Sequence, residues 1–237
     1  SLGKYMQAVK KDTPNQSLTE VTLIRLRDDI VCGDWAPATK LNIESLKKRY
    51  QVGGTPVREA LNQLVPLGLV MALPLKGFRV TALPVEAAQD VYATRRYLEK
   101  EMLRHALADK DDQWEAQCLA GLHRIKRCLQ KEGFNEQPDI AQWAALNAAF
   151  WHVFFSADDS LCLHQVHQGV GLCAQRYEYR LYRQSAQAFT LMQQQYETMV
   201  CLLDCCLEST VEAADHEHEQ YLTQLLQAIE QQGQETA

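Results

Sequence analysis

The chain has 237 residues, of which 46% are hydrophobic, enough for one large domain or two of ordinary size. No apolar run approaches the roughly 18 to 20 residues of a membrane span, and no charged-then-apolar signal sequence opens the chain. The net charge of −6 is uneven, because residues 1–82 have an excess of five basic side chains and residues 83–237 an excess of eleven acidic ones. A basic first third predicts contact with a polyanion.

The eight cysteines favour a reducing compartment. None is spaced as C-x-x-C, and most lie in apolar helical patterns, where free cysteine acts as a small hydrophobe. A chain of this length rarely needs a disulfide framework, so we expect free thiols and a cytoplasmic protein. The cysteines are Cys32, Cys118, Cys128, Cys162, Cys173, Cys201, Cys205 and Cys206.

The first predicted elements are two short helices. Residues 1–16 lack periodicity and are expected to form a mobile tail. Ser17 and Glu20 then match a capping box, S-x-x-E, which predicts a helix that ends at Gly33. A second helix, IESLKKRY, is expected to follow Asn42 as its N-cap.

A third helix is predicted to begin within VGGTPVREAL, residues 52–61. Thr55 is the expected N-cap, because its hydroxyl would accept from an unpaired backbone N–H, and Pro56 suits the first helical position. The helix is expected to end near Pro66 and Gly68.

Residues 69–83 then predict a β-hairpin. Two β-prone runs, LVMAL and FRVTA, flank Pro74–Gly77, with the cation Lys76 at the tip. Three short helices followed by a basic-tipped hairpin define a winged helix-turn-helix, which we assign to residues 17–83.

Beyond Pro84 the chain has only helical patterns. The predicted fold class is therefore mostly α, with an N-terminal winged helix-turn-helix and a C-terminal all-α six-helix bundle over residues 84–237. The six helices are expected near residues 85–108, 112–131, 138–156, 159–183, 187–208 and 210–231.

Arg58 is the main candidate for DNA recognition. A cation beside the positive end of a helix dipole is mildly unfavourable unless an anion binds there. In a winged helix-turn-helix the third helix enters the major groove, where an arginine fork matches guanine O6 and N7. The alternative is a solvated arginine paired with an acid such as Glu59. The predicted DNA-binding residues are Thr55, Arg58, Lys47, Lys48, Arg49, Asn62, Lys76 and Gly77.

Two stretches carry a family resemblance. TPVREALNQLVPLGLV followed by LKGFRV resembles the DNA-reading head of the GntR superfamily of bacterial repressors, over about residues 18–82. VYATRRYLEKEMLRHAL, residues 91–107, resembles the first helix of the FCD effector domain of the FadR-like branch. The resemblance implies a homodimer in which each protomer reads one half of a pseudo-palindromic operator.

The head departs from the family pattern at two places. Gly53 and Gly54 stand where the family usually has Ser-Arg, and Lys76 replaces the commoner arginine of the wing. The family arginine reads operator DNA, and loss of a bidentate contact costs about 1–3 kcal/mol of discrimination. The operator sequence or the affinity should therefore differ from the family norm.

The metal site of many FCD domains, an Asp and three His, is degenerate here. Asn147 and Trp151 replace the Asp and His of D-x-x-F-H, His152 is turned by about 100° around the helix, and Tyr196 replaces another His. Only His218 fits the pattern, so we expect no divalent metal and no other cofactor.

A second possible metal site is weaker still. His164 and His167 have an i, i+3 spacing that could chelate a metal, but single helical histidines are more often surface or core groups.

The same helices are expected to retain an effector pocket. Arg95 matches the family's arginine before Leu-Glu and is a candidate carboxylate anchor, since its fork suits that geometry. On the resemblance alone, the effector is a small organic acid or similar metabolite. Each residue has an ordinary alternative as a core aromatic or a solvated arginine. The predicted effector-binding residues are Arg95, Asn147, Trp151, Tyr196, His218, Arg176 and Arg183.

The leading hypothesis is a DNA-binding repressor, a homodimer controlled by a small molecule, and not an enzyme. No acid–base pair, nucleophile elbow or metal quartet is apparent in the sequence. One alternative is a protein-binding scaffold with a weakened DNA head, which Gly53 and Gly54 would favour. The other is a metalloenzyme built in a helical bundle.

Overall fold

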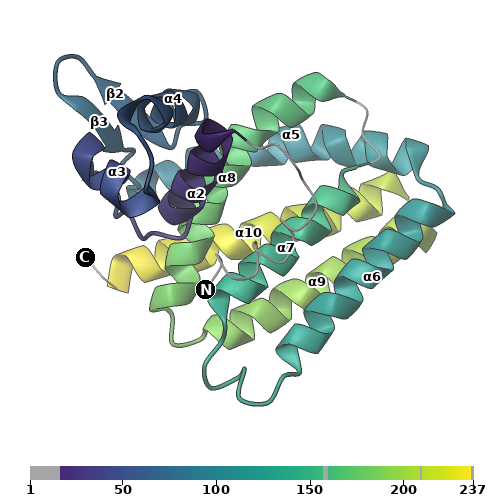
Figure 1. Cartoon of the computed structure of the whole chain (residues 1–237). Helices are drawn as coiled ribbons and strands as arrows, with labels where there is room; N and C mark the ends of the chain where they lie inside the picture. The colour runs from purple at the N-terminus through teal and green to yellow at the C-terminus, as the bar shows by residue number, and fades with distance from the viewer. Residues whose placement is uncertain (1–16, 157–159, 209, 236–237) are drawn as a thin grey trace. The chain divides into compact units, whose positions relative to one another are not determined.

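The computed structural model describes residues 17–156, 160–208 and 210–235 (Figure 1). The tail expected over residues 1–16 lies outside the described residues. The chain forms two compact units. Among the described residues, the first contains those up to Val91 together with Gln168–Arg180, and the second contains those of Tyr92–His167 and those from Leu181 onward.

Three short helices open the first unit: α2 (Leu18–Val31), α3 (Ile43–Tyr50) and α4 (Gly54–Leu64). The capping box at the start of α2 is confirmed, and so is Asn42 as the N-cap of α3. One fully buried leucine from each helix, Leu26, Leu46 and Leu61, contributes to the core. We call this three-helix domain with its sheet the head.

The prediction that Thr55 caps α4 is wrong. The helix begins at Gly54, its N-cap is Gly53 in an extended conformation, and no side chain caps it. Pro56 is compatible with both starts, because the first backbone N–H groups of a helix have no partner inside the helix. The first turn of α4 therefore presents its backbone donors without a side-chain acceptor.

A three-stranded antiparallel sheet completes the head. It has the order β1–β3–β2, with β1 at Lys40–Leu41, β2 at Val70–Leu73 and β3 at Gly77–Val80. The hairpin of β2 and β3 matches the predicted wing, whereas the two-residue strand β1 was not predicted. Its Leu41 is buried, as are Val70 and Val80, so these side chains fix the inner face of the sheet.

The middle of helix α8 (Leu161–Gln184) belongs to the first unit. A Cβ added to Gly169 would lie 3.4 Å from the backbone oxygen of Leu67, so the helix approaches the head backbone closely there. Arg176 donates to the carbonyl of Thr81 at 2.7 Å, and the Tyr177 hydroxyl donates to that of Pro84 at 2.8 Å. The predicted boundary after residue 83 would separate Gly169 from Leu67 and Arg176 from Thr81, although it keeps Tyr177 with Pro84.

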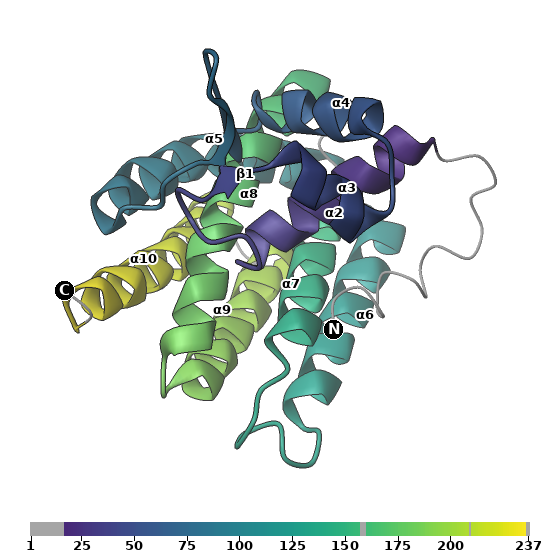
Figure 2. The ribbon, with the colours of Figure 1, turned by 60° about the vertical axis from the view of Figure 1, so that its left-hand side comes forward.

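The second unit is built from helices alone in its described part. Helix α6 packs against α7 and α9, and α9 packs against α10 (Figure 2). Trp143, Phe150 and Phe154 of α7 are fully buried. The bounds are α5 (Ala88–Asp109, after the short helix η2 at Val85–Ala87), α6 (Asp112–Leu129), α7 (Ile140–Phe154), α9 (Ala188–Glu208) and α10 (Val211–Glu235).

The mostly α fold class, a winged helix-turn-helix followed by a helical domain, is confirmed. Within the described ranges, no helix combines the length and the apolar character that crossing a membrane requires. All eight cysteines are free thiols.

Candidate functional site

Arg58 projects from α4 as an exposed cation. Within the described part of the chain it has no hydrogen bond or ion pair. The alternative pairing with Glu59 is not what the structure shows, because the Glu59 carboxylate accepts a hydrogen bond from the Thr19 hydroxyl at 2.7 Å. The guanidinium therefore remains available to an external anion.

The cations of α3 differ in their surroundings. The Lys47 ammonium lies 2.9 Å from Glu44, and Lys48 is exposed. Arg49 is held at the surface of the head by two ion pairs, because its guanidinium lies 2.9 Å from Asp29 and 3.3 Å from Asp34. Of the three predicted contacts from this helix, Arg49 is therefore the one with a structural role.

The sheet adds two cations that the sequence reasoning missed. Lys40 and Arg79 are directly paired residues of β1 and β3, and both are exposed. Like charges at such a pair repel each other, so an anion bound there would stabilise the sheet. The absence of Asp and Glu between residues 60 and 85 could have drawn attention to this basic hairpin. Lys76 and Gly77 lie at its exposed end, and Asn62 is exposed on α4.

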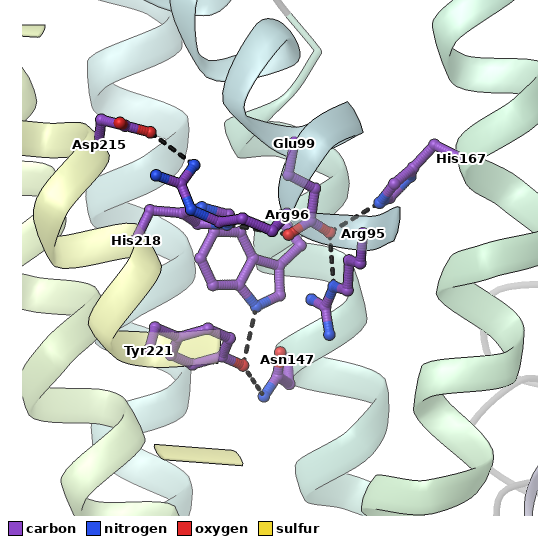
Figure 3. A network of polar contacts seen from close by, with 9 residues as sticks. Arg95, Arg96, Glu99, Asn147, His167, Asp215, His218 and Tyr221 are labelled. Atoms are coloured by element: carbon purple, nitrogen blue, oxygen red, sulfur yellow. Dashed lines mark hydrogen bonds and ion pairs between the residues drawn. The ribbon is translucent and has the colours of Figure 1, made fainter. Parts of the chain in front are cut away.

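In the second unit, the carboxylate of Glu99 lies at the centre of a buried polar network (Figure 3). Glu99 is 1% exposed. Its Oε1 lies 2.6 Å from Arg95 Nε and 2.7 Å from His167 Nε2, and its Oε2 lies 2.9 Å from His218 Nε2. Burial alone would raise the pKa of Glu99, but the Arg95 charge and the bonds from both histidines outweigh it and hold the pKa well below its usual range.

A second set of contacts lies beside this carboxylate. The Tyr221 hydroxyl accepts from Trp151 Nε1 at 3.2 Å and from Asn147 Nδ2 at 3.4 Å (Figure 3). The Trp151 ring also packs edge-on against His218, with centroids 5.7 Å apart. His218 is fully buried, and its Nδ1 has no hydrogen-bond partner within the described residues. Together these contacts join α5, α7, the beginning of α8 and α10.

The network contains four of the seven predicted effector residues: Arg95, Asn147, Trp151 and His218. Tyr196 is half-buried outside it. The neighbouring Gln195 is buried and accepts a hydrogen bond from the Tyr182 hydroxyl at 2.6 Å.

The two remaining candidates also lie elsewhere. Arg176 is in the first unit, bonded to Thr81, and burial lowers its pKa. Arg183 is exposed near the end of α8.

The residues present do not fit the family's metal. Asn147 and Trp151 use their N–H groups as donors to Tyr221, and His218 directs Nε2 toward Glu99. In the described ranges, no group of three or more His, Cys, Asp or Glu side chains is placed to hold a metal ion. That the protein binds no divalent metal stays a prediction.

The fold and the exposed basic head define a class, the proteins with a winged helix-turn-helix joined to a helical domain. Residues 18–80 match the family described as bacterial regulatory proteins, gntR family. Together with the relatives described next, this match shows that the chain is similar to transcriptional regulators of the GntR family.

Two curated relatives are transcriptional regulators. The chain is 39% identical over 145 residues to the uncharacterized HTH-type transcriptional regulator BphR of Paraburkholderia xenovorans, a match that spans 61% of this chain and 59% of that protein. It is 27% identical over 206 residues to the HTH-type transcriptional repressor GlaR of Escherichia coli, covering 87% of this chain and 93% of that protein. These relatives confirm the expectation of a regulator rather than an enzyme.

Solved structures share the fold. McbR/YncC of E. coli superposes with a TM-score of 0.78 at 20% identity, over 92% of this chain and 99% of that one. A putative GntR transcriptional regulator from Rhodococcus sp. RHA1 gives a TM-score of 0.66 at 19% identity, over 90% and 98%.

Proposed function

We propose that this protein is a cytoplasmic, homodimeric repressor that binds a pseudo-palindromic operator through its head. The observation that carries the proposal is the exposed Arg58 on an uncapped α4, with Glu59 bonded to Thr19 instead. A phosphate at the first turn of α4 would accept from backbone N–H groups, while Arg58 reaches a base edge. That the relative GlaR is a transcriptional repressor supports repression rather than activation.

The proposal is tested by recovering sheared genomic DNA on the immobilised protein and sequencing it, with Arg58→Ala as the comparison. A few enriched sites that share an inverted repeat, and that are lost in the variant, are expected. Arg49→Lys is a matched control, because Arg49 is held by Asp29 and Asp34. Absence of enrichment at low salt, with a folded protein, would favour the scaffold alternative.

We also propose that the second unit binds a small organic acid, as the FadR-like branch with an FCD domain does. Arg95 and His218 supply the donors that such an acid requires, but both already face Glu99. An entering carboxylate would compete with Glu99 for these N–H groups. The exchange would alter the contacts among α5, α7 and α10, and its effect on DNA binding is limited by the difference in affinity between the two states.

The effector proposal is tested by measuring thermal unfolding of the protein with a panel of small mono- and dicarboxylic acids. A binding acid should raise the unfolding temperature in a concentration-dependent way and should change the affinity for the recovered operator. Arg183→Gln, on the exposed end of α8, should leave both responses unchanged, whereas Asn147→Leu should weaken them. A panel without any shift would contradict the proposal.

A further inference from the structure

The turn at the tip of the wing has an unusual residue, Leu75, at the third of its four positions. The backbone N–H of Lys76 donates to the carbonyl of Leu73 at 3.0 Å, which closes a four-residue turn with Pro74 second and Leu75 third. Leu75 has a φ of 59°. A turn with proline second and positive φ third is of type II, a geometry that normally requires glycine or asparagine in third place. A bulky side chain at this φ is a backbone outlier.

The Leu75 side chain contributes nothing to the packing of the head. Its relative exposure is 108%, the highest among the large apolar side chains of the described residues. The folded head thus has both an unfavourable backbone conformation and an exposed apolar side chain at this point. A binding partner that buries the leucine would account for both.

The charges of the wing indicate which partner this is. Lys76 follows Leu75 directly, and Arg79 and Lys40 lie paired on the same sheet. The hairpin has no acidic side chain, since Asp and Glu are absent between residues 60 and 85. An apolar tip followed by cations is typical of proteins that bind the minor groove, insert a leucine between two neighbouring base pairs and kink the duplex.

We propose that Leu75 is an apolar wedge that the wing inserts into the minor groove of the operator, partly unstacking one base step and bending the DNA. Lys76 and Arg79 bind the flanking phosphates. The inference rests on the proposed function, operator binding by the head. The wedge would add specificity without a hydrogen bond to a base edge. Pyrimidine–purine steps such as TA and CA unstack most easily, so a duplex with such a step at the wedge would cost less free energy to bend.

The test compares Leu75→Asn with Leu75→Met in the full-length protein. Asparagine tolerates a positive φ and removes the wedge, whereas methionine keeps an apolar side chain of similar volume. The DNA is a duplex that the wild-type protein selects from a random-sequence library. Bending is measured by energy transfer between dyes at the two ends, and unstacking by 2-aminopurine placed at the candidate step.

The wild-type complex and Leu75→Met should bend the duplex by about 20° or more and raise the 2-aminopurine fluorescence. Leu75→Asn should still bind through α4, with about tenfold lower affinity, a straighter duplex and no fluorescence change. It should also unfold at a slightly higher temperature than the wild type, because the strain at the tip is relieved.

Three results would overturn the inference. If the wild-type complex is straight, or if Leu75→Asn bends the duplex as much as the wild type does, Leu75 is not a wedge. Either result would leave the proposal of operator binding intact. Unchanged bending with weaker self-association of Leu75→Asn would assign the tip to a protein contact. Failure of the wild-type protein to select any sequence would instead reject the proposed function itself.

Discussion

Arg95 and Glu99 form an ion pair one turn apart on α5, with 2.6 Å between Nε and Oε1, and both side chains are buried. Neither charge is solvated, so each depends on the other and on the histidines that face Glu99. The pair is therefore a sensitive point of the second unit, and two predictions concern it.

Glu99→Gln should lower the free energy of unfolding by about 3–5 kcal/mol, because it leaves the Arg95 charge buried without a counter-charge. Denaturation in urea, followed by circular dichroism, measures the change. Glu101→Gln is the matched control on the same helix. Glu101 pairs with Arg104 at the surface, so its loss should hardly move the midpoint. If both variants lowered the free energy of unfolding equally, the burial of the Arg95–Glu99 pair would not explain the loss.

The wild-type protein should lose the Glu99 contribution in acid. The pKa of Glu99 is lower in the folded protein than the ordinary value of 4.5, so the unfolded chain binds a proton first as pH falls. The stabilisation is complete above about pH 5 and declines from there toward the folded pKa. The difference in unfolding free energy between wild type and Glu99→Gln should therefore narrow between neutral pH and pH 3. A difference that does not change with pH would show that Glu99 is not the titrating group.

Arg58→Lys should lower specificity more than general DNA affinity. Lysine keeps the charge but lacks the bidentate fork, so discrimination at one base pair should fall by about 1–3 kcal/mol. Binding to a random duplex should change little. Fluorescence anisotropy with the selected duplex and its single-base variants measures both quantities. A uniform loss over all duplexes would make Arg58 a phosphate contact instead.

Gly54→Arg should strengthen DNA binding. A Cβ at Gly54 would meet only the Lys47 side chain, at 3.9 Å, and the backbone φ there is not positive, so an arginine is accommodated. The added cation should steepen the dependence of log affinity on log salt by about one unit. Gly54→Ala serves as the control for helix formation without charge. An unchanged slope would place this position away from the DNA.

Local signals allowed much of the head to be predicted. Ser17 with Glu20, and Asn42, act on backbone groups within three residues, so sequence spacing alone identifies these caps. The start of α4 could not be decided in this way, because Pro56 satisfies either start. Strand β1 has only two residues and exists through its pairing with β3, which short-range patterns do not contain.

The network around Glu99 was harder to predict than any cap. Arg95 and His218 were expected at an effector site. The pair of Arg95 with Glu99 is local to α5, but His167 and His218 reach Glu99 only through the packing of helices distant in sequence. Tyr221 was missed for the same reason. Tyr196 follows the buried Gln195 and is turned from it by about 100° around the helix, and Gln195 itself bonds to Tyr182 and not to this network.

The attachment of Gln168–Arg180 to the head also bears on how such regulators recombine. A single crossover after Leu83 would join a new head to an α8 whose Arg176 and Gly169 contact Thr81 and Leu67 of the original head. A functional chimera would need a second, internal exchange within α8. Recognition specificity in this lineage should therefore diversify by point substitution on α4 and the wing more readily than by shuffling of whole heads.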